Sequence, residues 1–190
     1  ELQARIRPHF LFNTLNSAIA LVREEPALAE TVLEDLAELF RHALTEQGES
    51  VPLSQELELA RRYLAIEKVR FGERLRVEWV LDASADTARL PPLLLQPLVE
   101  NAVKHGVEPS ESGAQIKIST QRRGSTVVIK VTNSMPAGAG ARGHGLALAN
   151  VRDRLNLLHD VQGSFLSAAK DGVFQARIEV PVEPIKGGNP

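Results

Sequence analysis

The stretch Leu95-Gln96-Pro97-Leu98-Val99-Glu100-Asn101-Ala102-Val103-Lys104-His105-Gly106 decides the fold of this chain. It continues a mainly apolar run that begins at Leu93, and such a run is typical of a helix buried in a core. Proline is tolerated in the first turn of a helix, so Pro91-Pro92 can open it, and Gly106 can end it. The sequence therefore predicts one buried helix from Leu93 to His105.

The polar side chains of this predicted helix lie close together on its surface. Asn101, Lys104 and His105 are three and four residues apart and share one face, with Glu100 one step round. An amide oxygen suits a hard cation, and cationic groups suit phosphate, so this face fits a magnesium–triphosphate. A solvated polar face is the alternative for an arbitrary helix, but the apolar run beside these residues favours a binding face.

A second candidate is His9, in the segment Arg7-Pro8-His9-Phe10-Leu11-Phe12-Asn13. Imidazole has an ordinary pKa close to neutrality and is a usable nucleophile in the cell. A lone histidine is more often a capping or core residue. The two other chemistry-bearing segments of the chain favour the nucleophile here.

Composition restricts the class of protein. The 190 residues are 43% hydrophobic and 24% charged, with a net charge of −2, so no global field favours nucleic acid. The absence of cysteine excludes disulfides and thiolate chemistry. No apolar stretch approaches the roughly 18 residues of a membrane span. Because the sequence starts at Glu1 inside a helical pattern, we expect a fragment of a longer protein, with any membrane anchor upstream.

The first 50 residues predict a helical hairpin. Apolar residues from Leu11 to Val22 recur at spacings of four and three, and the pattern resumes after Pro26 and runs to Ala43. Pro26 fits a break between the two helices and Gly48 a stop for the second. A hairpin this thin cannot bury both stripes, so we expect a second copy to complete a four-helix bundle, or packing on the rest of the chain.

The rest of the chain predicts helices that cover a mixed sheet. A helix is expected to start near the N-cap residue Ser54, with Glu56 and Glu58 in its first turn, and another to span Leu146 to His159. Strands are expected at residues 74–80, 116–119, 127–131, 164–168 and 173–180. The predicted class is α+β, with a hairpin (1–50), an α/β sandwich (51–183) and a disordered tail (184–190).

The residues from Met135 to Gly145 are rich in glycine and alanine and predict a mobile loop. Gly143, His144 and Gly145 lead into the predicted helix that follows, where backbone N–H groups can bind phosphate. Glycine-rich loops are common, so this signal is weak by itself. The segment is not a P-loop, because no Gly-Lys-Ser/Thr follows.

Taken together, three segments resemble the LytS-type sensor histidine kinases, with details similar to the AlgZ/FimS branch. The segments are Pro8 to Asn13, Leu95 to Gly106, and Asn150-Val151-Arg152-Asp153-Arg154-Leu155. The resemblance covers nearly the whole chain in the family's order. It implies a dimerisation hairpin that carries a phospho-accepting His9, followed by a Bergerat-type (GHKL) ATP-binding domain.

The resemblance also implies roles for single residues. Asn101 would be the magnesium ligand, and Lys104 and His105 would contact phosphate or ribose. Many histidine kinases have an acidic residue directly after the phospho-acceptor, where this chain has Phe10. Glu100 is by analogy a candidate base, and Asn13 could position a water that removes phosphate from the partner regulator.

The chain departs from the family's pattern after the second hairpin strand. Asn133 stands where the family usually has the aspartate that accepts a hydrogen bond from the adenine amino group. Its carbonyl oxygen can still accept, but without charge, which weakens nucleotide binding by roughly 1–2 kcal/mol. Ala147 replaces a later glycine, while Gly143 and Gly145 are kept.

The leading functional hypothesis is therefore an ATP- and Mg-dependent protein-histidine kinase core. It would form a homodimer through residues 1–50 and pass phosphate from His9 to a response regulator, which the resemblance suggests is of the LytTR type. It would act at the cytoplasmic face of a bacterial inner membrane without contacting nucleic acid itself. A catalytically weak scaffold or phosphatase that docks the regulator is the main alternative, and a GHKL ATPase without phosphohistidine is a third.

Overall fold

The computed structural model describes residues 8–45, 49–136 and 145–182. It opens with an antiparallel hairpin of α1 (Pro8–Leu21) and α2 (Pro26–Leu44), as predicted. Pro26 is the first residue of α2, where its fixed φ suits a helix and its missing N–H costs nothing. The predicted stop at Gly48 lies outside the described residues, and α2 already ends at Leu44. The buried stripe of α2 follows helical spacing: Ala29, Val32, Leu36, Leu39 and Ala43.

The third helix, α3 (Leu53–Phe71), begins differently from the prediction. Pro52, not Ser54, occupies the N-cap position, and the Ser54 N–H donates to the Asp86 carbonyl at 3.1 Å. A short antiparallel pair of β1 (Val51–Pro52) and β3 (Arg89–Leu90) fixes this start. Chain pairing rather than a side-chain cap therefore decides where α3 begins.

Five strands form the main sheet in the order β2-β4-β5-β7-β6. They are β2 (Leu75–Val80), β4 (Ala114–Arg123), β5 (Thr126–Ser134), β6 (Ser164–Lys170) and β7 (Val173–Pro181). Strands β2 and β4 are parallel, and every other neighbouring pair is antiparallel. The β4–β5 and β6–β7 hairpins turn at Gly124 and Gly172, whose positive φ angles of 61° and 74° favour glycine.

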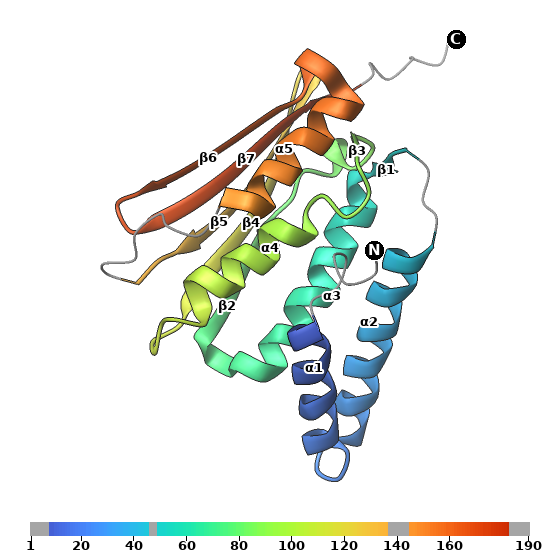
Figure 1. Ribbon diagram of the computed structural model, residues 1–190, viewed down its shortest axis with the longest axis vertical. Helices are drawn as coiled ribbons and strands as arrows, with labels where there is room; N and C mark the ends of the chain where they lie inside the picture. The colour runs from blue at the N-terminus through green and yellow to red at the C-terminus, as the bar shows by residue number, and fades with distance from the viewer. Residues whose placement is uncertain (1–7, 46–48, 137–144, 183–190) are drawn as a thin grey trace.

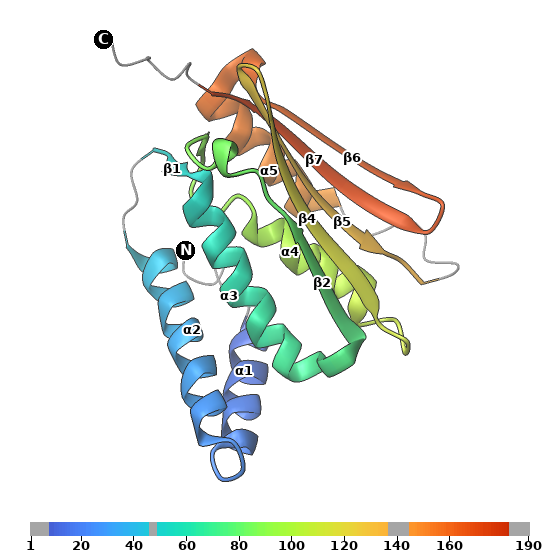
Figure 2. The same cartoon turned by 180° about the vertical axis from the view of Figure 1, so that it is seen from behind.

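The elements stack in layers (Figures 1 and 2). Helices α4 (Gln96–Ala102) and α5 (Gly145–His159) lie on one face of the sheet, and α3 lies between the sheet and the α1–α2 hairpin. The fully buried core side chains come from both layers and include Leu95, Val99, Ile116, Ile118, Ile129, Leu155 and Ile178. This architecture confirms the predicted α+β class. Within the described ranges, no helix is both long and apolar enough to span a bilayer.

The helix predicted from Leu93 to His105 is shorter in the structure. Helix α4 starts at Gln96, not Leu93, and ends at Ala102, where a π-helical turn (Val103–Val107) takes over. Leu93 has a φ of +58°, which an α-helix cannot contain. The N–H groups of Leu93 and Leu95 donate to the Glu56 carboxylate instead of starting the helix.

Candidate functional site

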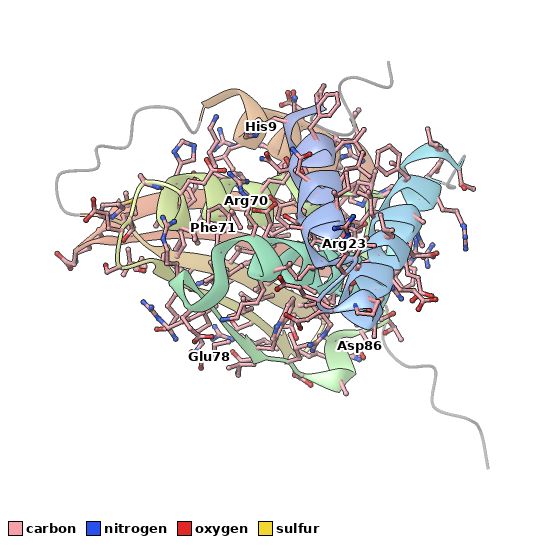
Figure 3. All side chains as sticks on the ribbon, turned by 90° about the horizontal axis from the view of Figure 1, so that it is seen from below. His9, Arg23, Arg70, Phe71, Glu78 and Asp86 are labelled. Atoms are coloured by element: carbon pink, nitrogen blue, oxygen red, sulfur yellow. The ribbon has the colours of Figure 1, made fainter. Side chains whose placement is uncertain are left out.

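His9 lies in the first turn of α1, where its side chain is exposed. Figure 3 labels His9 on this helix and Arg23 in the turn beyond its other end. Helical spacing brings Asn13 beside the imidazole, with Asn13 Nδ2 at 3.2 Å from Nδ1 and 3.4 Å from Nε2. The amide can donate to an unprotonated ring nitrogen, so Asn13 lies beside His9, while its role in positioning a water stays a prediction.

Phe10 connects this end of α1 to the centre of the molecule. Its ring centroid is 5.0 Å from that of Tyr63 on α3. It also lines a small cavity together with residues of α2, α4 and the segment before α4: Leu39, Phe40, Ala43, Leu93, Gln96 and Glu100. The residue after His9 therefore packs beside the helix that carries the predicted nucleotide ligands.

The predicted ligands of this region differ in exposure. Asn101 is only 5% exposed, Glu100 and His105 are partly buried, and Lys104 is exposed. Glu100 Oε1 accepts a hydrogen bond from Gln96 Nε2 at 3.0 Å. Lys104 and His105 belong to the π-helical turn, which is wider than an α-helical turn, so the single α-helical face expected from the sequence is not formed. Such π-turns occur frequently at functional sites.

Asn133 lies next to the same turn. It is 2% exposed and projects from β5 on the helix-covered side of the sheet, as do the alternate residues Val127, Ile129 and Val131. Its Nδ2 donates to the Ser134 carbonyl at 3.1 Å. A Cβ at Gly106 would lie 2.9 Å from both Asn133 Nδ2 and the Ser134 oxygen. The absence of a side chain at Gly106 therefore lets the π-turn approach Asn133.

The predicted phosphate-binding loop is only partly described. Gly143 and His144 lie outside the described residues, and Gly145 is the first residue of α5. The start of this helix agrees with the prediction to within one residue. The structure thus brings Glu100, Asn101, Lys104, His105 and Asn133 into one region, while the contribution of residues 143 and 144 stays a prediction.

Sequence reasoning missed a buried carboxylate on α3. Glu67 is 3% exposed, and its Oε2 has no hydrogen-bond partner among the described residues. Burial raises the pKa of Glu67 to about 7, because desolvation outweighs the attraction of Arg70, and the nearby Glu108 and Glu100 carboxylates raise it further. Arg70 Nη1 lies 3.6 Å from both Glu67 and Glu108.

Two arginines without an assigned role also belong to this end of α3. Arg70 lies over the ring of Phe71 at 4.6 Å, and both residues are labelled in Figure 3. Arg74 donates to the carbonyls of Val107 at 3.1 Å and Ser110 at 2.8 Å. Arg74 thereby satisfies carbonyl groups at the end of the π-turn.

The residues present fit a magnesium ion that enters with a nucleotide. Asn101 offers an amide oxygen, a hard donor that Mg²⁺ accepts, and Mg²⁺ is usually held by one or two protein donors plus phosphates and waters. In the described part of the chain, no group of three or more His, Cys, Asp or Glu side chains could hold a metal ion.

Sequence comparison matches residues 1–75 to the histidine kinase family model. The sensor histidine kinase BtsS of Escherichia coli (strain K12) is 35% identical over 185 residues, covering 95% of this chain and 32% of BtsS. The sensor protein LytS of Enterococcus faecalis (strain ATCC 700802 / V583) is 28% identical over 198 residues, covering 96% and 34%. The chain thus spans about a third of the length of these relatives.

Solved structures show the same fold. The catalytic domain of histidine kinase ThkA aligns with a TM-score of 0.53 and 20% identity, covering 72% of this chain and all of that one. The Acinetobacter baumannii histidine kinase AdeS aligns with a TM-score of 0.54 and 13% identity, covering 90% and 94%. Residues 1–75 match the histidine kinase model, and nearly the whole chain is similar to sensor histidine kinases, LytS among them, as its motifs predicted. Its place in the AlgZ/FimS branch stays a prediction.

Proposed function

We propose that this chain is the kinase core of a two-component sensor. It phosphorylates His9 with Mg-ATP and then passes the phosphoryl group to an aspartate of a response regulator, which we propose is of the LytTR type. The observation that carries this proposal is the small cavity that Phe10 lines together with Gln96 and Glu100. The end of α1 with the nucleophile therefore lies near the helix with the proposed nucleotide ligands.

The proposed step is an in-line phosphoryl transfer. A ring nitrogen of His9 forms a bond to the γ-phosphorus as the bond from that phosphorus to the β,γ-bridging oxygen breaks, and ADP leaves. Phosphoryl transfer depends mainly on positioning and charge neutralisation, so the protein's task is to align groups. The Asn13 amide orients the imidazole, and Glu100 is the candidate acceptor of the imidazole proton.

The nucleotide's charge is neutralised by groups of the π-turn region. Magnesium bound to ATP offsets phosphate charge, and Asn101 would hold it through the amide oxygen. Lys104, which is exposed, and His105 would contact phosphate or ribose. Asn133 would accept from the adenine amino group, and the backbone of residues 143–145 would bind phosphate.

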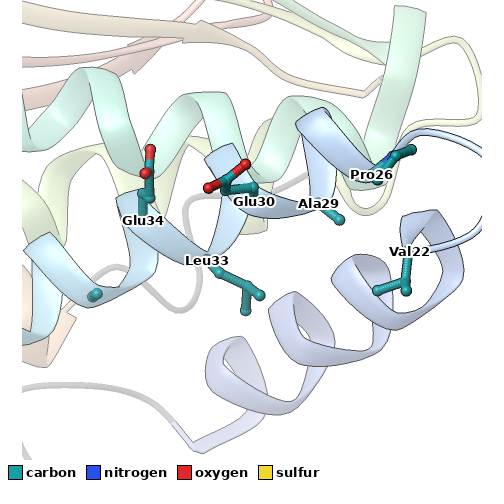
Figure 4. A pocket seen from close by; sticks show the side chains of 7 residues that line it. Val22, Pro26, Ala29, Glu30, Leu33 and Glu34 are labelled. Atoms are coloured by element: carbon teal, nitrogen blue, oxygen red, sulfur yellow. The ribbon is translucent and has the colours of Figure 1, made fainter.

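We further propose that two copies associate through the hairpin. A mainly apolar groove of about 460 Å³ lies along α2 and the turn that precedes it (Figure 4). It is lined by Val22, Pro26, Ala29, Leu33 and Ala37, with Glu30 and Glu34 beside them. Ile19, Val22 and Leu33 are 70%, 54% and 42% exposed, which leaves apolar surface for a partner. A second hairpin would cover this surface and complete a four-helix bundle.

The proposed location is the cytoplasmic face of the bacterial inner membrane, where a cytoplasmic regulator has access. The curated relatives are sensor proteins about three times as long as this chain, so attachment would use a segment outside these 190 residues.

A catalytically weak scaffold or phosphatase is the second candidate, and Asn133 is the observation that favours it. This residue is buried at the proposed adenine position without the negative charge of the usual aspartate. Weak ATP binding would then leave regulator docking, with Asn13 positioning a water, as the main activity.

The test is incubation of the chain with γ-labelled ATP and Mg²⁺. We expect acid-labile, alkali-stable label on the parent and on His42→Ala, a matched control on the same hairpin, and none on His9→Ala. An unlabelled parent that still accelerates loss of phosphate from a phosphorylated regulator would favour the phosphatase. ATP hydrolysis that is unchanged in His9→Ala, without protein label, would favour a plain ATPase.

A further inference from the structure

The segment between β3 and α4 has a backbone that needs external support. Leu93 has a φ of +58°, in the left-handed region that residues with a Cβ rarely adopt. It is followed by Leu94 and Leu95, which are fully buried. Residues in such conformations persist only where their surroundings hold them, and they cluster at functional sites.

Glu56 holds this segment from the side of α3. Its Oε1 accepts the Leu93 N–H at 2.6 Å, and its Oε2 accepts the Leu95 N–H at 2.9 Å. Glu56 is 2% exposed, so a carboxyl group is buried against this backbone. Each carboxylate oxygen accepts one of these N–H groups, whereas a glutamine amide of the same size offers only one accepting oxygen.

Arg154 holds the same segment from the side of α5. Its Nη1 donates to the Leu93 carbonyl at 3.3 Å, and its Nη2 donates to the Pro92 carbonyl. The guanidinium fork can serve two carbonyls together, whereas an ammonium group is a single point charge. Burial raises the pKa of Glu56, and the backbone N–H groups together with the Arg154 charge offset part of this rise, so the two side chains attract each other.

The supported segment lies between the two halves of the proposed site. Leu93 lines the cavity that also contains Phe10, the residue after His9. Helix α4, with Glu100 and Asn101, begins directly after Leu95. A change in this segment would therefore move the start of α4 relative to α1.

We propose that Glu56 and Arg154 are positioning residues for the phosphoryl transfer. They clamp residues 92–95 and so set the start of α4 against the end of α1 that carries His9. This inference rests on the proposed kinase function. The far end of the nucleotide region is held separately, by the close approach of Gly106 to Asn133. The clamp therefore acts on the rate of transfer rather than on nucleotide affinity.

The first test compares Arg154→Gln with the matched control Arg152→Gln, an exposed arginine of the same helix that lies over the Phe165 ring at 5.9 Å. At a temperature where circular dichroism shows all variants folded, we expect Arg154→Gln to lower the rate of His9 labelling at saturating ATP about tenfold or more. We expect the Kd for a fluorescent ATP analogue to change less than about threefold. Arg154→Lys should recover part of the rate.

Each other outcome has a meaning. Equal labelling rates for Arg154→Gln and Arg152→Gln would overturn the clamp, as would a parallel loss of affinity and rate. If the unmodified chain is not labelled at His9, the proposed kinase function itself is refuted, whatever the variants show.

The second test is a double-mutant cycle. If Glu56 and Arg154 act through one segment, Glu56→Gln combined with Arg154→Gln should be little slower than the slower single variant. Effects that multiply would show that the two residues act independently and would overturn the shared clamp. Glu58→Gln serves as the control for Glu56→Gln, because Glu58 is 55% exposed and forms an ion pair with Arg62 at 3.1 Å.

Discussion

At the scale of single residues, two acids on the buried stripe of α3 have opposite surroundings. Glu56 accepts two backbone N–H groups, whereas Glu67 keeps one oxygen without a hydrogen bond among the described residues. Both stand four and seven residues from the core residues Ala60 and Tyr63, a pattern visible in the sequence. That pattern could have marked them as buried, but only the fold shows what they contact.

The raised pKa of Glu67 predicts a pH-dependent stability. The group binds its proton more tightly in the folded state, with a pKa of about 7 against 4.5 for the ordinary value. The contribution of Glu67 to the free energy of unfolding is therefore largest below pH 4.5, and it decreases as the pH rises to about 7. The loss is up to roughly 3 kcal/mol at about 1.4 kcal/mol per pKa unit.

We expect Glu67→Gln to remove this dependence. Urea unfolding should show the variant more stable than the parent at pH 8 by about 1–3 kcal/mol, and the difference should shrink at pH 5. Glu58→Gln, at an exposed position, should follow the parent at both values. If the parent became more stable relative to Glu67→Gln as the pH rises, the raised pKa of Glu67 would be contradicted.

We expect Asn133→Asp to change stability and ATP affinity in opposite directions. An aspartate there would lose the N–H that Asn133 donates to Ser134 and would bury a charge, which costs about 1–3 kcal/mol of stability. The same carboxylate would accept more strongly from an adenine amino group and tighten ATP binding about tenfold. Calorimetric titration with an ATP analogue, beside thermal unfolding of Asn133→Asp, measures both. Unchanged affinity would remove Asn133 from the proposed adenine contact.

At the scale of elements, most of the architecture could be predicted from the sequence. The hairpin, the five main strands and the helix before His159 follow from apolar periodicity, because each element buries one face. The limits of α4 could not be predicted. Its start depends on Glu56, 37 residues before Leu93, and its end on a π-turn whose neighbour Asn133 lies on β5. Neither contact can be inferred from the local propensity of residues 93–107, because both partners are distant in the sequence.

The π-turn gives a prediction of its own at Gly106. A methyl group there would lie 2.9 Å from Asn133 Nδ2 and the Ser134 oxygen, so the turn must move away from β5. We expect Gly106→Ala to lower stability by about 1–3 kcal/mol and to weaken ATP binding. Gly124→Ala is the contrasting variant, because its turn has open space and only the positive φ opposes the methyl group. Normal affinity in a folded Gly106→Ala would separate the turn from the nucleotide region.

At the scale of the whole molecule, the sequence allowed the hairpin to pack on a second copy or on the rest of the same chain. The structure shows packing on the rest of the chain. Helices α1 and α2 pack on α3, with the Phe10–Tyr63 ring contact and a 2.7 Å ion pair between Arg62 and Asp35. The opposite apolar residues stay exposed, including Ile19 and Val22. Packing on α3 therefore buries only part of the hairpin's apolar surface, and the rest is the surface that the proposed second copy would cover.

This remaining surface predicts a dimer that a single charge can weaken. Leu33 lines the hairpin groove and is 42% exposed, so Leu33→Lys would place an ammonium group in the proposed interface of both copies. We expect the dissociation constant to rise about tenfold for each copy, measured by sedimentation equilibrium. Leu166→Lys is the matched control, since Leu166 is 63% exposed on β6, far from the hairpin in Figure 1. If both variants dissociate like the parent, or both weaken equally, the groove is not the interface. Selective weakening in Leu33→Lys, with α3 contacts intact, would show that the hairpin serves two partners at once: its own core on one side and a second chain on the other.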